Sequence, residues 1–296
     1  MKTTIPDELK ADVPPTKWGK ILTITPIVMT VIATMLAGLS SSEMTKAQYS
    51  RSLAAQLQSK AGDQWSFFQA KKLRGAMQRS TLDILKGSTE VRDLDMDAME
   101  KTTGSTRAPM TAMDKALATA AQPATIDPNI KAAMQAVENS KPESEVTEAV
   151  KKLDDKTLAD ALQAAKDRAA EFDTSLEPVT PGFDQIEKKL FATDKALAHD
   201  FTAVRLNYAA LRYDMEAKLN QSVAGIYELQ VRRSDLEAAR HHERSQRFFY
   251  GMLAAQMGVI ISTFALAAQK RSWLWSVAAI AGLIAVSFAA YVYICI

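Results

Sequence analysis

The sequence predicts an all-α membrane protein in which three transmembrane helices carry a long antiparallel helical hairpin, coiled-coil-like, that bears a small helical head. Three stretches are apolar, free of charge and close to the roughly 20 helical residues that cross a bilayer. Prolines are absent between Pro26 and Pro109 and again after Pro181. Because proline breaks helix interiors, each flank of the chain can form one long helix, while the middle must consist of short elements.

The composition excludes several classes of protein. The chain has 296 residues and a net charge of +2, so nothing in its charge favours nucleic acid as a partner. Residues 41–246 hold 29 of the 36 basic and 31 of the 34 acidic residues, so the charge is concentrated outside the apolar stretches. The only cysteine is Cys295, which excludes an intrachain disulfide and a cysteine-based metal cluster.

The N-terminal tail, residues 1–20, leads into the first predicted span, residues 21–40. Trp18 stands where an aromatic residue of the membrane interface is expected. The same segment could be a cleaved secretory signal, since it follows a lysine-bearing tail and contains the small residues Ala37 and Gly38. Its apolar run is longer than a typical signal core and the chain begins with Met1, so we predict an uncleaved anchor.

Residues 41–87 are predicted to continue the first span as an ascending helix. Leu53, Leu57, Ala61 and Trp65 recur at intervals of four, which is typical of one face of a helix. Gly87 predicts the end of this helix.

An aromatic cluster on this helix, Trp65, Phe67 and Phe68, is the most specific stretch outside the predicted spans. It lies roughly 25 residues, or nearly 40 Å, beyond the first span, which is too far for an aromatic belt at the membrane surface. Two interpretations remain open: the cluster packs against the partner helix of the hairpin, or it forms a docking face for another subunit.

Residues 88–179 contain five of the ten prolines and are predicted to form a small head of short helices. Asp127 followed by Pro128 is typical of a helix start, because the carboxylate can cap free amides and proline suits the first helical position. No β-strand pattern of consequence occurs in the sequence.

Residues 180–247 are predicted to form a descending helix that begins at Thr180 and passes without a break into the second span. Thr180 offers a capping hydroxyl and Pro181 fits the first helical turn. Apolar residues recur every seven positions, with a second set four further on, as in a coiled-coil seam. The predicted packing positions are Leu197, Phe201, Val204, Tyr208, Leu211 and Met215.

The second predicted span is residues 248–268, followed by a basic turn at 269–272 and a third span at 273–296. Aromatic and basic residues stand at the ends of these spans, where a membrane interface favours them. The predicted interface residues are Trp18, Arg244, Arg247, Phe248, Phe249, Lys270, Arg271, Trp273, Trp275, Tyr291 and Tyr293.

The orientation follows from basic residues in short loops. Four lysines precede the first span, and Lys270 and Arg271 occupy the turn between the second and third. We therefore expect the N-terminus and the turn on the cytoplasmic side and residues 41–247 on the other. Five arginines near the second span favour the reverse, but long domains cross membranes largely regardless of charge.

Two fragments resemble metal sites without completing one. The acidic run starting at Asp93 has Ala98 where a calcium loop needs glycine and Gly104 where it needs glutamate. The His241-His242-Glu243 sequence has Gln246 where a zinc-protease helix needs its second histidine. We predict no catalytic, metal-binding or cofactor-binding residue.

Asp63-Gln64-Trp65, the aromatics after it and Gln69-Ala70-Lys71 resemble the bacterial membrane proteins of the domain-of-unknown-function family 4337. The pattern Gln256-Met257-Gly258-Val259, with Lys270-Arg271 and Leu274-Trp275 after it, is similar to the paired terminal spans of that family. The likeness covers about residues 15–80 and 225–296, which makes the head a candidate insertion. The resemblance implies a bacterial inner (cytoplasmic) membrane and a coiled-coil hairpin between one N-terminal and two C-terminal spans, and it implies no activity. In such a membrane, the orientation inferred from the basic residues puts residues 41–247 in the periplasm.

These observations predict a non-enzymatic scaffold, anchored in the lipid bilayer, that assembles with copies of itself. Two long seams offer more apolar surface than one antiparallel pair buries, and small residues in the spans permit close packing. The alternative is an accessory or regulatory subunit of a transporter, channel or respiratory complex, with another membrane protein as the partner. An enzyme in the head lacks a supporting motif.

Overall fold

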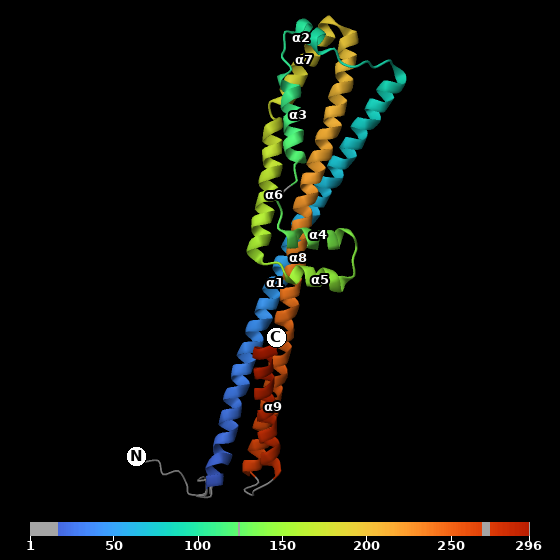
Figure 1. Cartoon of the computed structure of the whole chain (residues 1–296). Helices are drawn as coiled ribbons and strands as arrows, with labels where there is room; N and C mark the ends of the chain where they lie inside the picture. Colours follow the sequence, from blue (N-terminus) through green and yellow to red (C-terminus); the bar gives the residue numbers. More distant parts are fainter. Residues whose placement is uncertain (1–16, 124, 268–272, 296) are drawn as a thin grey trace, which may run out of the picture. The chain divides into compact units, whose positions relative to one another are not determined.

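The computed structural model describes residues 17–123, 125–267 and 273–295, and these are helical almost throughout, without a β-strand among them. The all-α prediction is therefore confirmed. The helices of the described residues, in chain order (Figure 1), are α1 (Lys17–Ser88), α2 (Met96–Thr103), α3 (Ala108–Ala121), α4 (Pro128–Glu138), α5 (Glu143–Lys151), α6 (Asp155–Leu176), α7 (Val179–Thr193), α8 (Lys195–Ala267) and α9 (Trp273–Cys295).

The chain divides into two compact units. The terminal unit comprises Met1–Ser52 and Asp235–Ile296, and the central unit comprises Leu53–Ser234. Helices α1 and α8 contribute to both units, and in each unit they contact one another as the two limbs of an antiparallel hairpin.

The descending helix starts differently from the prediction. The helix begins at Val179 rather than Thr180, and it ends at Thr193, so α7 and α8 are separate helices. The break falls at Asp194, which has an extended backbone (φ −144°) and whose carboxylate accepts hydrogen bonds from the amides of Ala196 and Leu197, each at 3.0 Å. An aspartate that caps a new helix in this way competes with continuation of the old one.

The core of the head is formed by α2, α3, α6, α7 and the first turns of α8. Phe183 of α7 stands edge-on to Phe201 of α8, with ring centroids 6.0 Å apart, and stacks on Tyr208 at 5.8 Å. Three helices of the central unit begin at side-chain caps: Asp95 before α2, Asp127 before α4 and Asp154 before α6 each accept bonds from first-turn amides.

Among the described residues, two helices rather than the predicted three are long and apolar enough to cross a membrane: Thr23–Ser88 in α1 and Lys195–Ala267 in α8. Only 22% of the apolar window of α1 and 28% of that of α8 are buried. The third predicted span corresponds to α9, whose apolar stretch, Ser276–Val292, is shorter than the roughly 20 residues that a bilayer requires. The prediction of three spans is corrected to two on this criterion.

Candidate functional site

A buried row of small residues runs along α8 in the central unit. One member occurs every seven positions, so all of them lie on one face of the helix. Each is less than 10% exposed: Ala203, Ala210, Ala217, Ala224 and Val231.

Helix α1 carries the matching row at the same spacing. In the central unit it consists of Ala54, Ala61, Phe68, Gly75 and Leu82, of which all but the half-buried Phe68 are buried. At Gly75 the two rows meet, because an added Cβ there would lie 3.6 Å from the carbonyl oxygen of Ala210. Small side chains on both helices let the helix axes approach closely, so this small-residue seam is the contact that pairs α1 with α8.

Charged side chains flank the small-residue seam. Lys71 of α1 forms an ion pair with Glu216 of α8, whose side chain is only 4% exposed and also contacts Arg212 at 2.6 Å. About two turns further along α1, Arg79 pairs with Asp214 of α8. These contacts join the two helices at fixed positions.

Asp173 of α6 lies beside this ionic cluster. Burial raises the pKa of its carboxyl, and the negative charge of Glu216 raises it further, while Lys71 and Arg212 act in the opposite direction. Three helices, α1, α6 and α8, therefore bring titratable groups close enough to influence one another, and the carboxylates of Asp173 and Glu216 are balanced by Lys71 of α1 and Arg212 of α8.

The packing residues predicted on α8 face the head rather than α1. Leu197 and Phe201 are buried in the core of the head, and Tyr208 and Met215 pack against that core. Val204 is half-buried, and Leu211 is 42% exposed. Helix α8 thus has a second buried face, on which Leu197, Phe201 and the partly buried Tyr208 and Met215 lie.

The aromatic cluster of α1 is split between two directions. Trp65 and Phe68 are half-buried and stand edge to face, with centroids 5.5 Å apart. Phe67 is 53% exposed and points elsewhere. Both interpretations of the cluster therefore remain open. Trp65 and Phe68 fit internal packing, and the exposed Phe67 fits a docking face for another subunit.

A second surface of α1 was not predicted. Leu73, Met77 and Ile84 are 64%, 59% and 67% exposed, although they are large apolar side chains. Leu73 and Met77 each lie two positions from Gly75, and Ile84 lies nine positions from it. Each of these separations is a rotation of about 180–200° around the helix axis, so all three side chains point away from the small-residue seam. We call the exposed row Ala70, Leu73, Met77, Ser80, Ile84 and Gly87 the outer stripe.

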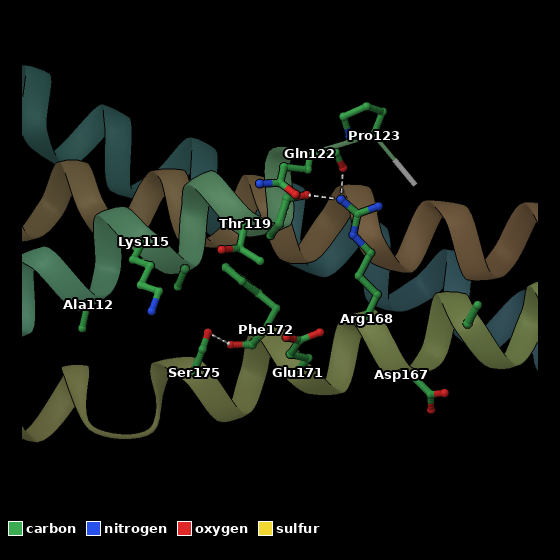
Figure 2. Close-up of a pocket in the computed structure, with 13 residues that line it drawn as sticks. Ala112, Lys115, Thr119, Gln122, Pro123, Asp167, Arg168, Glu171, Phe172 and Ser175 are labelled. Atoms are coloured by element: carbon green, nitrogen blue, oxygen red, sulfur yellow. Dashed lines mark hydrogen bonds between the residues drawn. The ribbon is translucent and has the colours of Figure 1, made fainter. Parts of the chain in front are cut away.

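The head contains an open cleft of about 770 Å³ between α3 and α6. Alanines 112, 116 and 120 of α3 and Phe172 of α6 give it an apolar lining, and Figure 2 shows Phe172 lying between the two helices. Arg168 donates from Nη2 to the carbonyl oxygens of Ala120, at 2.8 Å, and Gln122. The guanidinium therefore satisfies carbonyls at the C-terminal end of α3 and fastens α6 to it.

The polar groups around this cleft have mixed signs. Lys115 and Glu171 lie on opposite helices, and Asp167 points away from the cleft in Figure 2. Ser175 donates its hydroxyl hydrogen to the carbonyl of Phe172 at 2.7 Å, so it is engaged in its own helix. The cleft can hold a small amphipathic molecule, but its charges do not select one sign of ligand.

In the terminal unit, α1 and α8 are joined by polar contacts. Ser40 and Ser245 exchange hydrogen bonds, each hydroxyl donating to the carbonyl of the other residue, at 2.9 and 2.8 Å. Glu43 of α1 is 8% exposed and contacts Nδ1 of His241 on α8 and Nζ of Lys46, both at 2.7 Å. Burial raises the pKa of the Glu43 carboxyl, but the hydrogen bonds and charges of Lys46 and His241 outweigh it and lower the pKa overall.

Glycines bring α9 close to α1 and α8 in the same unit. A Cβ at Gly251 would lie 3.2 Å from Leu36 and 3.3 Å from the carbonyl of Ala285, and a Cβ at Gly282 would collide with Met29 at 2.4 Å. Three helices therefore meet where side chains are absent, which is typical of helix packing in membranes.

The predicted interface residues have diverse positions. Arg247 of α8 stacks over the ring of Tyr291 on α9, 4.6 Å from its centroid. Phe248 is buried in the core of the terminal unit, while Phe249 and Trp273 are exposed and Arg244 is half-buried. Lys270 and Arg271 lie outside the described residues, as do the side chains of Trp18, Trp275 and Tyr293.

Among the described residues, no group of three or more His, Cys, Asp or Glu side chains could hold a metal ion. The two incomplete metal motifs serve other roles. Asp95 of the acidic run caps α2, and His241 is engaged with Glu43.

Comparison with known proteins gives one match. The family model described as "Domain of unknown function (DUF4337)" matches residues 18–180. The matched range includes the head, so the prediction that residues 88–179 are an insertion is wrong. The matched range ends before residues 225–296, where the second part of the likeness was predicted. No curated protein and no solved structure matches the chain.

Proposed function

This chain belongs to the DUF4337 family, and from the packing of its helices we propose that it is a non-enzymatic, membrane-anchored scaffold that assembles with copies of itself. The exposure of its longest apolar segments carries this proposal. Fewer than a third of the residues in the apolar windows of α1 and α8 are buried, so these windows are not the interior of a water-soluble core. Lipid tails are the environment that such surfaces require.

Helix α9 packs along the two candidate spans inside the bilayer in this proposal. The contact between Arg247 and Tyr291 places the end of α9 beside the start of the apolar part of α8. The glycine contacts at Gly251 and Gly282 support the same arrangement. Arg247, which also pairs with Glu243, then lies at the membrane surface, where a guanidinium and a tyrosine ring are both favoured.

The proposed orientation keeps the N-terminus in the cytoplasm and residues 41–247 on the opposite side, as the basic residues of the short loops favour. A reporter enzyme that functions only outside the cytoplasm, inserted after Thr106 in the loop between α2 and α3, tests this orientation. An active reporter is expected. Activity of a strictly cytoplasmic reporter at the same position would reverse it.

A scaffold role is supported by the ion pairs that the buried charged residues of the central unit form within the chain. Its most buried charged side chains, Asp200 and Glu216, each contact a basic residue on another segment of the chain, Arg92 and Lys71. Their chemistry is used to hold segments together. The exposed apolar residues of α1 supply the surface through which a rigid hairpin can associate.

The experiment that tests the proposal is extraction of the full chain from membranes followed by measurement of its mass in several mild detergents. The expected results are resistance to alkaline carbonate and a particle that contains more than one copy. Release by carbonate would overturn the membrane anchor. A monodisperse monomer in all the detergents would overturn self-assembly.

A further inference from the structure

We propose that the outer stripe of α1 binds the outer stripe of a second copy, so that the two α1 helices pair in parallel and in register. This inference rests on the proposed function, because it names the surface through which the anchored chains assemble. The stripe is exposed over its whole length, while the opposite face of α1 is covered by α8 through the small-residue seam.

The spacing of the outer stripe is that of a coiled-coil seam. Its members follow one another at intervals of three, four, three, four and three residues, which are the a and d positions of successive heptads. Leu73, Met77 and Ile84 supply the apolar side chains. Ala70, Ser80 and Gly87 are small, so the helices can approach closely between them.

The outer stripe contains no charged residue, although α1 contains many. Between residues 70 and 87 the helix contains six charged residues, and none of them occupies the outer stripe. The uncharged face extends toward the membrane end through Ser59, Gly62 and Ser66, all exposed, and a Cβ at Gly62 would meet nothing within 4 Å. A face that only contacted water would have no reason to exclude charge over so many turns.

The charges beside the outer stripe suit a second copy of the same helix. In a parallel, in-register pair, the residues on one flank of the stripe face those on the opposite flank of the partner. Arg74 on one flank then lies near Gln69 and Ala76 of the other copy, and Asp83 on the other flank lies near Thr81. No two like charges are brought together, so pairing costs no repulsion.

Anchoring in one bilayer fixes the direction of pairing. Two copies that share a membrane and an orientation have their α1 helices pointing the same way, so a two-fold axis along the membrane normal relates them. Such an axis brings each residue of the stripe against its own counterpart. Met77 therefore faces Met77 of the other copy.

The single cysteine of the chain makes this arrangement directly testable. In a Cys295→Ser background, Met77→Cys places one thiol on the outer stripe, and Ala76→Cys places it one residue away on the flank of the same turn. A disulfide requires Cα atoms about 4.4–6.8 Å apart, which the symmetric pair supplies at position 77 and not at 76. Both positions are exposed, so both variants are expected to fold.

Oxidation in native membranes is expected to convert at least ten times more of the Met77→Cys protein than of the Ala76→Cys protein into a covalent dimer. Met77→Lys is expected to weaken association in detergent at least tenfold, while Ala76→Gln, which adds a neutral polar side chain on the flank near Arg74 of the other copy, leaves it unchanged. Equal cross-linking of the two cysteine variants, or association unaffected by Met77→Lys, would overturn the parallel stripe. If the unmodified protein were still larger than a monomer, self-assembly would stand and use another face.

Discussion

Glu43 on α1 lies 2.7 Å from Nδ1 of His241 on α8, and the same carboxylate contacts Lys46. An ionised carboxylate can only accept hydrogen bonds, so Nδ1 of His241 carries the hydrogen in this contact. The carboxylate is 8% exposed, so its charge is stable there only because both partners are in place.

This contact predicts a dependence of stability on pH. The pKa of Glu43 is lowered below its ordinary value of 4.5 by the bonds to Lys46 and His241. The stabilisation is therefore fully present above pH 4.5 and is lost as the pH falls through the lowered pKa. Glu43→Gln should lower the unfolding free energy by about 1 kcal/mol at pH 7, because a neutral hydrogen bond replaces a charged one.

Thermal unfolding of the two proteins in the same detergent, at a series of pH values, checks this prediction. The gap between their melting temperatures should shrink below pH 4.5. Equal melting temperatures of the two proteins at pH 7 would show that the Glu43 charge contributes nothing to folding.

The pair formed by Lys71 and Glu216 predicts an asymmetry between its two members. Glu216 is 4% exposed and cannot reach water, while the Lys71 side chain is 26% exposed and can. Lys71→Met should therefore destabilise the protein by about 1–3 kcal/mol, and Glu216→Leu should cost less. The double variant should recover part of the loss, because an apolar pair of similar volume can replace a buried ion pair. Denaturant unfolding of the three variants measures the coupling free energy between the two residues. Equal losses of unfolding free energy in the two single variants would contradict the prediction.

Close approach at Gly75 predicts a position-specific effect of a larger side chain. A Cβ there would lie 3.3 Å from Oδ1 of Asp214 and 3.5 Å from Cβ of Tyr213. Gly75→Leu should separate α1 from α8 and cost about 1–3 kcal/mol through overpacking. The matched control is Gly62→Leu on the same helix, where the added Cβ meets open space; it should leave stability unchanged or raise it by up to about 1 kcal/mol, because leucine is a better helix former than glycine.

Tyr208 donates its hydroxyl hydrogen to Asp114 at 2.8 Å, and burial together with this carboxylate raises its pKa to about 12. The bond therefore contributes fully below pH 10 and is lost as the pH rises through about 12. Tyr208→Phe should cost about 1 kcal/mol at neutral pH. An ultraviolet titration of the folded protein should show one tyrosine ionising late, and that component should be absent from the variant. A late component that persisted in Tyr208→Phe would assign it to another residue.

The all-helical fold could be predicted because proline placement and apolar length act on the chain locally. The seam between α1 and α8 could not, since Leu197 and Phe201 dominate the heptad pattern of α8, while the residues that contact α1 are alanines such as Ala210. Alanine contributes little to a hydrophobic periodicity, yet its small side chain permits the closest approach of two helix axes. A search for small residues at intervals of seven in both long helices would have found it.

Other differences between the prediction and the structure have local causes. Asp194 interrupts the descending helix without proline or glycine, because its side chain caps the next helix. The outer stripe was missed because Leu73, Met77 and Ile84 are interspersed in its heptad pattern with small residues, so its apolar periodicity is weak. The aromatic motif at Trp65 correctly indicated the family, although it gave no sign that the head belongs to it.

The small-residue seam leaves one problem for the folding chain. Alanine occupies four of the five positions of the α8 row, so α8 alone offers little to distinguish a hairpin displaced by one heptad, although Phe68, Gly75 and Leu82 on α1 differ in size. Discrimination between the correct alignment and the displaced one must come from contacts that do not repeat. Lys71 with Glu216 provides one in the central unit, and Ser40 with Ser245 provides another in the terminal unit. These polar pairs add little to the total burial, but they make every other alignment leave a charge or a hydroxyl without its counterpart.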